Sequence, residues 1–250
     1  MFHLKANSDE ETNGYEGLNL KRLELATKSS LEKKMAPKRG TRDWFKFQYQ
    51  TSPMSPIYWC KYDNKKSLKD WTLETHGKPF ALFEVDLPTF NTVEKLVQDT
   101  WQQDKVGKGR DAHGLDGLNY TNITVKKIER VENCNLFQSY AIKRQELFKK
   151  GMKKGAFVDL ENVTKANGKI LTTGNISQDS VLRKDLFTEV NEHYMFHGTQ
   201  AAVVDTIMKQ GLDARLAGTG AMLGLGVYTA ESSTKSDQYS GMVLQVHVNE

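Results

Sequence analysis

Hydrophobic residues recur with a helical period in three stretches of the chain. After Pro88 they fall at positions i, i+3, i+4, i+7 and i+8, and Asn91 is placed to cap the first turn. This spacing predicts a helix that ends near Gly107. Its inward positions are Val93, Leu96, Val97, Thr100 and Trp101.

The segments 132–151 and 201–211 predict two further helices. Each closes on a glycine, Gly151 or Gly211, a residue that favours the backbone conformation found after a helix end. The inward positions are Leu136, Phe137, Tyr140, Arg144, Leu147 and Phe148 in the first, and Val203, Val204, Ile207 and Met208 in the second.

Apolar and polar residues alternate in shorter stretches, which predicts strands. These stretches are 120–131, 192–198, 226–230 and 241–248. In the last one every second residue is apolar, so we expect this strand to lie inside a sheet. The segment 151–188 has glycines and polar residues but little periodicity, and we interpret it as an extended surface insertion.

The first 87 residues have a different texture. Residues 1–40 are polar and contain few aromatics, which predicts a disordered tail or linker. Its basic end is interpreted as solvated charge, with a nuclear localisation patch or a nucleic-acid contact as the alternative.

Residues 41–87 alternate aromatic and polar residues at strand length, which predicts a small aromatic-rich β region. We favour the view that its aromatics form the core of a small sheet. Alternatively they stack on bases while neighbouring lysines meet phosphates. The residues concerned are Trp44, Phe45, Trp59 and Trp71, with Lys46, Lys61 and Lys65.

Composition restricts the class of protein. Hydrophobic residues make up 38% of the 250 residues and charged ones 26%, as in soluble globular proteins, and no apolar run could span a bilayer. Cys60 and Cys134 lie far apart without metal-type spacing, so we expect an intracellular protein, nuclear or cytoplasmic. A net charge of +4 is compatible with an anionic ligand but does not require one.

The glycine-rich stretch 218–226 fails the test for a dinucleotide fingerprint. Gly218 and Gly220 fit the pattern, but Leu223 stands where the third glycine is needed, and the stretch leads into a strand instead of a helix. A zinc site at His193 and His197 is also disfavoured, because Glu192 precedes both histidines and the segment predicts a strand.

Two segments together resemble a known family. "NEHYMFHGT" at 191–199 and "GLDARLAGTGAMLGLGVYTAESSTKSDQY" at 211–239 are similar, in order and spacing, to the catalytic domain of the poly(ADP-ribose) polymerase family, especially its tankyrase-like and mono-ADP-ribosylating branches. The resemblance covers roughly residues 90–250. It implies a truncated catalytic domain over 88–250 with the α+β ADP-ribosyltransferase fold, in which two mostly antiparallel sheets pack together with flanking helices.

The resemblance implies that NAD is the substrate and that no metal is needed. The backbone of Gly198 would hydrogen-bond the nicotinamide carboxamide, the hydroxyl of Ser236 would complete that contact, and Tyr239 would stack on the ring. The segment 214–224 would cover the dinucleotide as a lid.

The resemblance also implies two catalytic positions. His197 would hydrogen-bond the adenosine ribose, and Tyr228 would form another wall around the nicotinamide. Thr199 would contribute to cofactor binding, and Lys235 would lie near the ribose and pyrophosphate.

The expected activity is transfer of ADP-ribose from NAD to protein acceptors with release of nicotinamide. The family has an acidic catalytic residue further along its domain, a role that we do not transfer to Glu250, so we expect the chain to be a fragment. Thr229 also departs from the aromatic residue usual in the family. The alternative is an inactive module of the same fold that binds NAD or ADP-ribose or interacts with nucleic acid.

Overall fold

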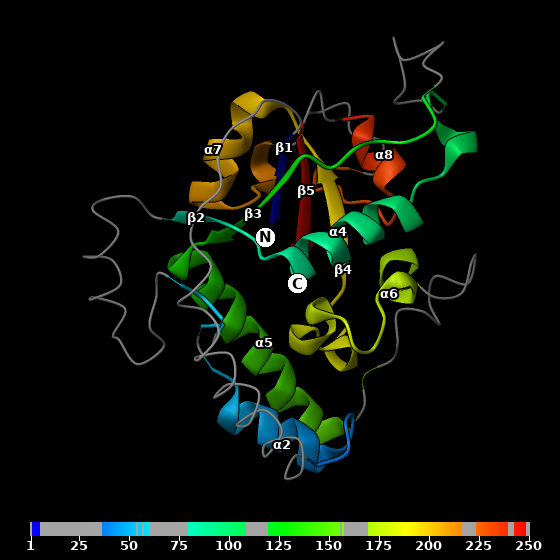
Figure 1. Ribbon diagram of the computed structural model, residues 1–250. Coiled ribbons are helices and arrows are strands. Elements are labelled where there is room, and N and C mark those ends of the chain that lie inside the picture. Colours follow the sequence, from blue (N-terminus) through cyan, green and yellow to red (C-terminus); the bar gives the residue numbers. More distant parts are fainter. Residues whose placement is uncertain are drawn as a thin grey trace.

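The computed structural model describes residues 2–5, 37–53, 55–56, 58–60, 80–108, 120–155, 157, 170–216, 224–239 and 243–248. It is a mixed structure in which a small sheet stands between helices (Figure 1). The segments 6–36, 61–79, 109–119 and 158–169 lie outside the described residues, and so do residues 217–223 of the predicted lid.

One sheet is formed by the described residues, and each of its strand pairs is antiparallel. Its order is β2-β3-β1-β5-β4, so β5 lies inside the sheet as the sequence predicts. The second sheet of the expected fold stays a prediction. The strands are β1 (Phe2–Lys5), β2 (Ala81–Glu84), β3 (Lys127–Glu132), β4 (Tyr194–Gly198) and β5 (Val243–Val248).

The position of β1 corrects the prediction that residues 1–40 are a polar tail throughout. Residues 2–5 form the central strand, in which Leu4 is paired with Ile128 of β3 on one side and with Leu244 of β5 on the other. Four residues are too few for a periodicity to stand out from a polar segment. Pairing along both edges, which is a tertiary effect, determines this strand.

The α-helices are α2 (Arg42–Thr51), α4 (Leu87–Asp99), α5 (Cys134–Lys154), α6 (Leu171–Asn175), α7 (Ala201–Gln210) and α8 (Ser233–Asp237). Short 3₁₀ turns are η1 (Gln103–Lys105), η3 (Val181–Asp185), η4 (Thr188–Val190) and η5 (Ala214–Leu216).

Helices cover both faces of the sheet. The larger core lies under α4, α6 and η3, where Val93, Leu96 and Leu186 meet Ile128 and Phe196 of the sheet. On the other face, Val204 and Met208 of α7 pack on Val131, whereas Val203, which was predicted to point inward, is exposed. The predicted inward face of α4 is confirmed for the four residues that are buried: Val93, Leu96, Val97 and Thr100.

The predicted start of α4 is wrong. The helix begins at Leu87, because Asp86 accepts a hydrogen bond from the backbone N–H of Thr89 and Pro88 lies in the first turn, where its missing N–H costs nothing. It ends at Asp99 instead of near Gly107. Likewise β3 begins at Lys127, later than the predicted strand over 120–131.

The predicted strand at the start of 41–87 is also wrong, because residues 42–51 form α2. Thr41 caps this helix by accepting from the N–H of Trp44. Trp44 and Phe45 are buried against Phe148 of α5, so aromatic packing between two helices overrides the strand-like alternation.

This packing explains why α5 continues past Gly151, its predicted end. A Cβ at Gly151 would stand 2.6 Å from the ring of Phe45, so the glycine gives the ring of α2 room to approach. The helix ends instead at Gly155, which has a φ of 84°.

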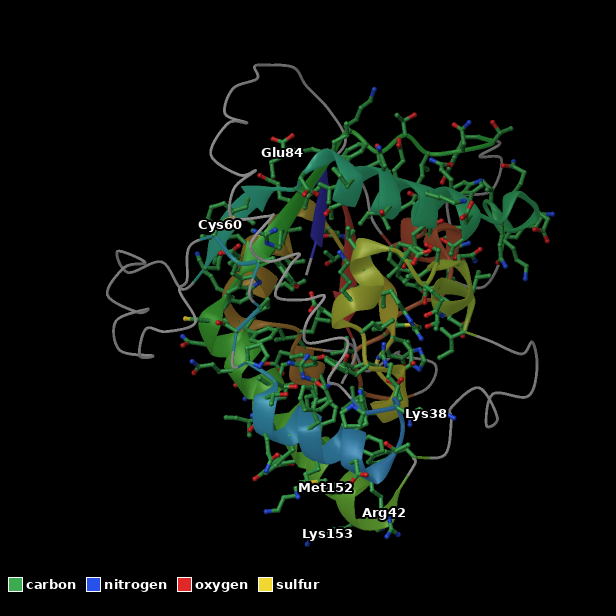
Figure 2. All side chains as sticks on the ribbon, turned by 60° about the horizontal axis from the view of Figure 1, so that its bottom comes forward. Lys38, Arg42, Cys60, Glu84, Met152 and Lys153 are labelled. Carbon is green, nitrogen blue, oxygen red and sulfur yellow. The ribbon has the colours of Figure 1, made fainter. Side chains whose placement is uncertain are left out.

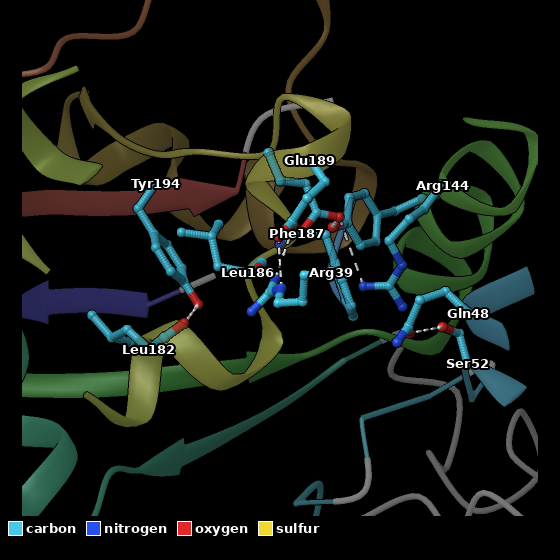
Figure 3. A network of polar contacts seen from close by, with 11 residues as sticks. Arg39, Gln48, Ser52, Arg144, Leu182, Leu186, Phe187, Glu189 and Tyr194 are labelled. Atoms are coloured by element: carbon cyan, nitrogen blue, oxygen red, sulfur yellow. Dashed lines mark hydrogen bonds and ion pairs between the residues drawn. The ribbon is translucent and has the colours of Figure 1, made fainter. Parts of the chain in front are cut away.

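Polar contacts join the α2 segment to the turn before β4 (Figure 3). Arg39 donates to the backbone oxygen of Leu186 at 2.9 Å, pairs with Glu189 at 2.6 Å and lies over the ring of Trp44. The hydroxyl of Tyr194 in β4 donates to the oxygen of Leu182 at 3.3 Å. The turn is therefore held from both sides.

The described part of 151–188 is not a surface insertion. Between 170 and 186 the chain contributes four residues to the buried core, and Thr172 is fully buried with its hydroxyl donating to the oxygen of Tyr194. The buried apolar residues are Ile170, Ile176, Leu182 and Leu186. They lie in or beside the short helical segments α6 and η3. The spacing of these apolar residues along the chain is irregular, so it shows no helical or strand period.

Candidate functional site at the open edge of β4

Within the part of the chain that the structure describes, the outer edge of β4 is paired at one point only. Phe196 and Ala230 exchange two backbone hydrogen bonds, of 2.8 and 2.7 Å, and form an isolated bridge. The predicted strand over 226–230 is otherwise not formed, since residues 226–229 do not continue this pairing as a strand. No strand among the described residues pairs with the edge of β4 beyond Phe196.

The backbone of Gly198 points toward this open edge. In a strand, the N–H and C=O groups of alternate residues point to the same side. Because both groups of Phe196 are bonded to Ala230, those of Gly198, two residues later, point away from β5 and past the end of the bridge. One donor and one acceptor thus lie side by side at the end of β4.

The helix α8 lies directly against Gly198. A Cβ on this residue would stand 1.8 Å from the backbone oxygen of Ser236 and 3.0 Å from Cβ of Tyr239. Only glycine allows β4 and α8 to approach so closely. Three of the predicted site residues are therefore brought together: Gly198, Ser236 and Tyr239.

Residues that the sequence analysis did not single out hold α8 in this place. Ser232 caps the helix, Ser233 donates to the oxygen of Val97 at 2.7 Å, and Thr234 accepts from the N–H of Gln102 at 2.7 Å. Gln238 donates to the oxygen of Lys108 at 2.9 Å. The run of hydroxyl residues before Lys235 is the signal that could have indicated a capped helix start.

His197 and Tyr228 meet across the same edge. Nδ1 of His197 lies 2.8 Å from the backbone oxygen of Tyr228, and this ring nitrogen is a donor in that contact because a carbonyl can only accept. The hydroxyl of Tyr228 donates to the oxygen of Gly224 at 2.7 Å. These contacts orient both side chains and fix the course of residues 224–228.

Lys235 joins the cluster through Tyr239. Its Nζ lies 5.2 Å from the centre of the Tyr239 ring and donates to Gln238 at 3.1 Å. Tyr228 and Tyr239 are 39% and 46% exposed, so part of each aromatic side chain remains accessible to a ligand. Thr199, the last predicted site residue, directly follows Gly198 and is half-buried.

Asp237 faces away from this cluster, toward Tyr120. The Tyr120 hydroxyl donates to its carboxylate, and the ring of Tyr120 packs on Trp101. Burial raises the pKa of the Asp237 carboxyl, and the hydrogen bond from Tyr120 offsets part of that rise. This contact adds to the attachments that Thr234 and Gln238 make to the segment after α4.

The two histidines considered for zinc have separate surroundings. His193 is buried, with Nδ1 2.7 Å from the hydroxyl of Thr173, whereas His197 faces Tyr228. Glu192 is buried and accepts from the N–H of Phe187 at 2.8 Å. Within the described ranges, no group of three or more His, Cys, Asp and Glu residues lies together in a way that could hold a metal ion.

A comparison with protein families decides the identity of this arrangement. The model of the poly(ADP-ribose) polymerase catalytic domain matches residues 110–245, more than half of the chain. The protein belongs to this family. The poly(ADP-ribose) polymerase match includes β4, α8 and the bridge at Ala230, and therefore the whole cluster around Gly198.

Membership places the protein among the ADP-ribosyltransferases, whose family activity uses NAD as the substrate. It also implies the ADP-ribosyltransferase fold, of which the mixed helices and small antiparallel sheet are part. Where the structure describes the chain, no helix has the length and apolar character needed to cross a membrane.

Proposed function

We propose that this protein transfers ADP-ribose from NAD to protein side chains and releases nicotinamide. The observation that carries the proposal is the open edge at Gly198, where a backbone donor and acceptor lie side by side between exposed tyrosines. A primary carboxamide presents a matching acceptor and donor. Nicotinamide bears such a group on a flat aromatic ring.

The surrounding residues fit the rest of such a ligand. Ser236 lies against Gly198 and would add a hydroxyl donor to the carboxamide oxygen, while the exposed ring of Tyr239 would stack on the pyridine. Tyr228 would face the ring from the other side. This arrangement orients the bond between nicotinamide and ribose, and orientation alone supplies a large part of a rate acceleration.

The remaining residues would serve the dinucleotide. His197 donates through Nδ1 to Tyr228, and its Nε2 would face a ribose hydroxyl. Lys235 would place positive charge near the pyrophosphate, and Thr199 would contact the dinucleotide at the end of β4. In this proposal, side chains of this protein bind and orient the dinucleotide.

The transfer itself breaks the bond between nicotinamide and ribose and forms a bond from ribose to an acceptor side chain. Nicotinamide leaves with the electron pair of the broken bond, and the acceptor group loses its proton. Because the nicotinamide of NAD is cationic, it departs as a neutral molecule and needs no metal to assist it. The developing positive charge on the ribose is stabilised electrostatically.

The test is incubation of the full chain with NAD labelled in its adenylate phosphate, with label on protein and free nicotinamide measured together. We expect both to appear in equal amounts. Replacing His197→Ala and Tyr228→Ala together should abolish both signals, because ligand orientation at the edge is lost. Val203→Ala, an exposed residue on α7, is the matched control and should leave both signals intact.

Each outcome bears on a different part of the proposal. Transfer that survives the double substitution would contradict the site. NAD binding without release of nicotinamide would favour the alternative, an inactive NAD-binding module of the same fold. The absence of NAD binding would contradict both functions.

A further inference from the structure

Seven exposed cations gather on α2, α5 and the segment before α2, and none forms an ion pair with another described residue. Figure 2, which turns this end of the molecule forward, shows Lys38, Arg42 and Lys153 at the same end, on neighbouring elements. The seven residues, called the basic face below, are Lys38, Arg42, Lys46, Lys149, Lys150, Lys153 and Lys154.

Two exposed lysines on other α-helices are paired within their own helix. Lys95 of α4 meets Asp99 at 2.7 Å, and Lys209 of α7 meets Asp205 at 2.5 Å, each one helical turn away. On the basic face, three pairs of cations lie one helical turn apart.

Like charges at i, i+4 repel in three places there. The pairs are Arg42 and Lys46, Lys149 and Lys153, and Lys150 and Lys154. Each pair destabilises its helix by about as much as an opposite-charge pair would stabilise it. An anionic partner that lies across these helices would relieve that repulsion. A solvated surface with mixed charges would have no such repulsion to relieve.

The charge is also concentrated. The whole chain has a net charge of +4, which is less than the seven positive charges on this face. Asp43 is an exposed acid among them, and Glu146 is taken by Lys143 at 3.4 Å. The rest of the chain therefore has a net negative charge, so an anionic partner is directed to this end of the molecule.

The burial of two aromatic residues limits the type of contact that the basic face can make. Trp44 and Phe45 are 2% and 0% exposed, so they cannot stack on bases as one interpretation of the sequence required. The cations around them remain exposed. Contact with a repeating phosphate backbone stays available, and readout of bases by these aromatics does not.

We propose that the basic face binds the phosphate backbone of a nucleic acid without reading its sequence. Several phosphates at regular spacing match cations on two packed helices better than a single small anion does. The face lies at the α2 end of the molecule, whereas α8 and the candidate NAD site lie at the opposite end (Figure 1). The proposal therefore does not rest on the proposed transferase activity.

The experiment measures binding of a fluorescent oligonucleotide of about 20 nucleotides, single-stranded or duplex, to the full chain over a range of salt concentrations. The variant carries Lys149→Gln, Lys150→Gln, Lys153→Gln and Lys154→Gln together. Each lost phosphate contact removes about 0.7–0.9 from the slope of log affinity against log salt. We expect the slope to fall by about 3 and the affinity to fall at least about tenfold.

The matched control removes four exposed lysines elsewhere, by Lys95→Gln, Lys105→Gln, Lys126→Gln and Lys209→Gln. It changes the net charge equally and should bind almost as the original chain does. Urea unfolding midpoints close to that of the original chain show that both variants are folded. The His197→Ala and Tyr228→Ala chain should also retain oligonucleotide binding.

Three results would overturn the proposal. The first is the absence of oligonucleotide binding at low salt. The second is an equal loss in the variant and the control, which would show that net charge and not this face is responsible. The third is tighter binding to vesicles of anionic lipid, or to an acidic polypeptide, that the oligonucleotide does not displace.

Discussion

Two glycines of this protein leave no room for a Cβ, yet their surroundings differ. At Gly151 the atom would meet the ring of Phe45 at 2.6 Å, inside the buried contact of α2 with α5. At Gly198 it would meet the backbone oxygen of Ser236 at 1.8 Å, at an open sheet edge beside exposed tyrosines. Close approach of a neighbouring element therefore does not by itself indicate a functional glycine. A functional glycine is indicated when its backbone N–H and C=O also point out of the sheet.

The largest effect is expected at Gly198. Gly198→Ala forces β4 and α8 apart and displaces the donor and acceptor of the edge. Two hydrogen bonds worth about 1–1.5 kcal/mol each correspond to a loss of NAD affinity of roughly 30- to 150-fold. Calorimetric titration with NAD measures it.

Gly226→Ala is the control for this change. It lies on the segment that faces β4, but a Cβ there would meet nothing within 4 Å. NAD affinity should stay within about twofold of the original, a difference below about 0.4 kcal/mol. If both variants lose affinity alike, the contact with Ser236 is not what matters.

Gly151→Ala should lower the stability of the protein without changing its affinity for NAD. Pushing the ring of Phe45 out of a packed contact costs about 1–3 kcal/mol of unfolding free energy, as overpacking generally does. Urea unfolding measures this loss, while NAD affinity should not change. A variant that loses NAD affinity without losing stability would contradict the distinction between the two glycines.

A smaller effect is expected where α8 is anchored. Thr234→Val removes the acceptor for the N–H of Gln102 and so loosens the helix that packs on Gly198. The loss of one hydrogen bond, about 1 kcal/mol, should lower NAD affinity about fivefold. Thr92→Val removes an exposed hydroxyl on α4 that donates to the backbone oxygen of Pro88. This control should leave NAD affinity unchanged.

The smallest effect concerns Asp237. Because its pKa is raised in the folded state, the stability linked to its protonation is present below the ordinary value near 3.8 and is lost as pH rises through the raised pKa. Asp237→Asn, which still accepts from Tyr120, should gain stability relative to the original chain as pH rises above about 4. Unfolding followed from pH 4 to 8 tests this sign, and a difference that shrinks over this range would contradict it.

The sequence predicted the parts that have a clear local period. The helices α4, α5 and α7 and the strands β4 and β5 are present where apolar spacing predicts them, although the ends of α4 and α5 differ, and Gly211 ends α7. The site residues stood out as motifs along the chain, and the structure brings His197, Gly198, Tyr228, Ser236 and Tyr239 to one edge. Their roles toward NAD stay predictions.

The sequence could not predict what tertiary contacts decide. Residues 42–51 have strand-like alternation, but burial of Trp44 on α5 makes them helical. β1 exists because two neighbouring strands pair with it, and residues 226–229 form no strand although their composition favours one. The proposed function depends on the edge of β4 that these residues face.

The most direct test of this account is an NMR titration of the chain labelled with ¹⁵N-glycine, with the two resonances assigned through Gly198→Ala and Gly151→Ala. If Gly198 binds the carboxamide, its amide proton shifts downfield on addition of NAD, and nicotinamide alone produces the same shift at higher concentration. The Gly151 resonance should stay in place. NAD binding at saturation that leaves the Gly198 amide unmoved would contradict the account.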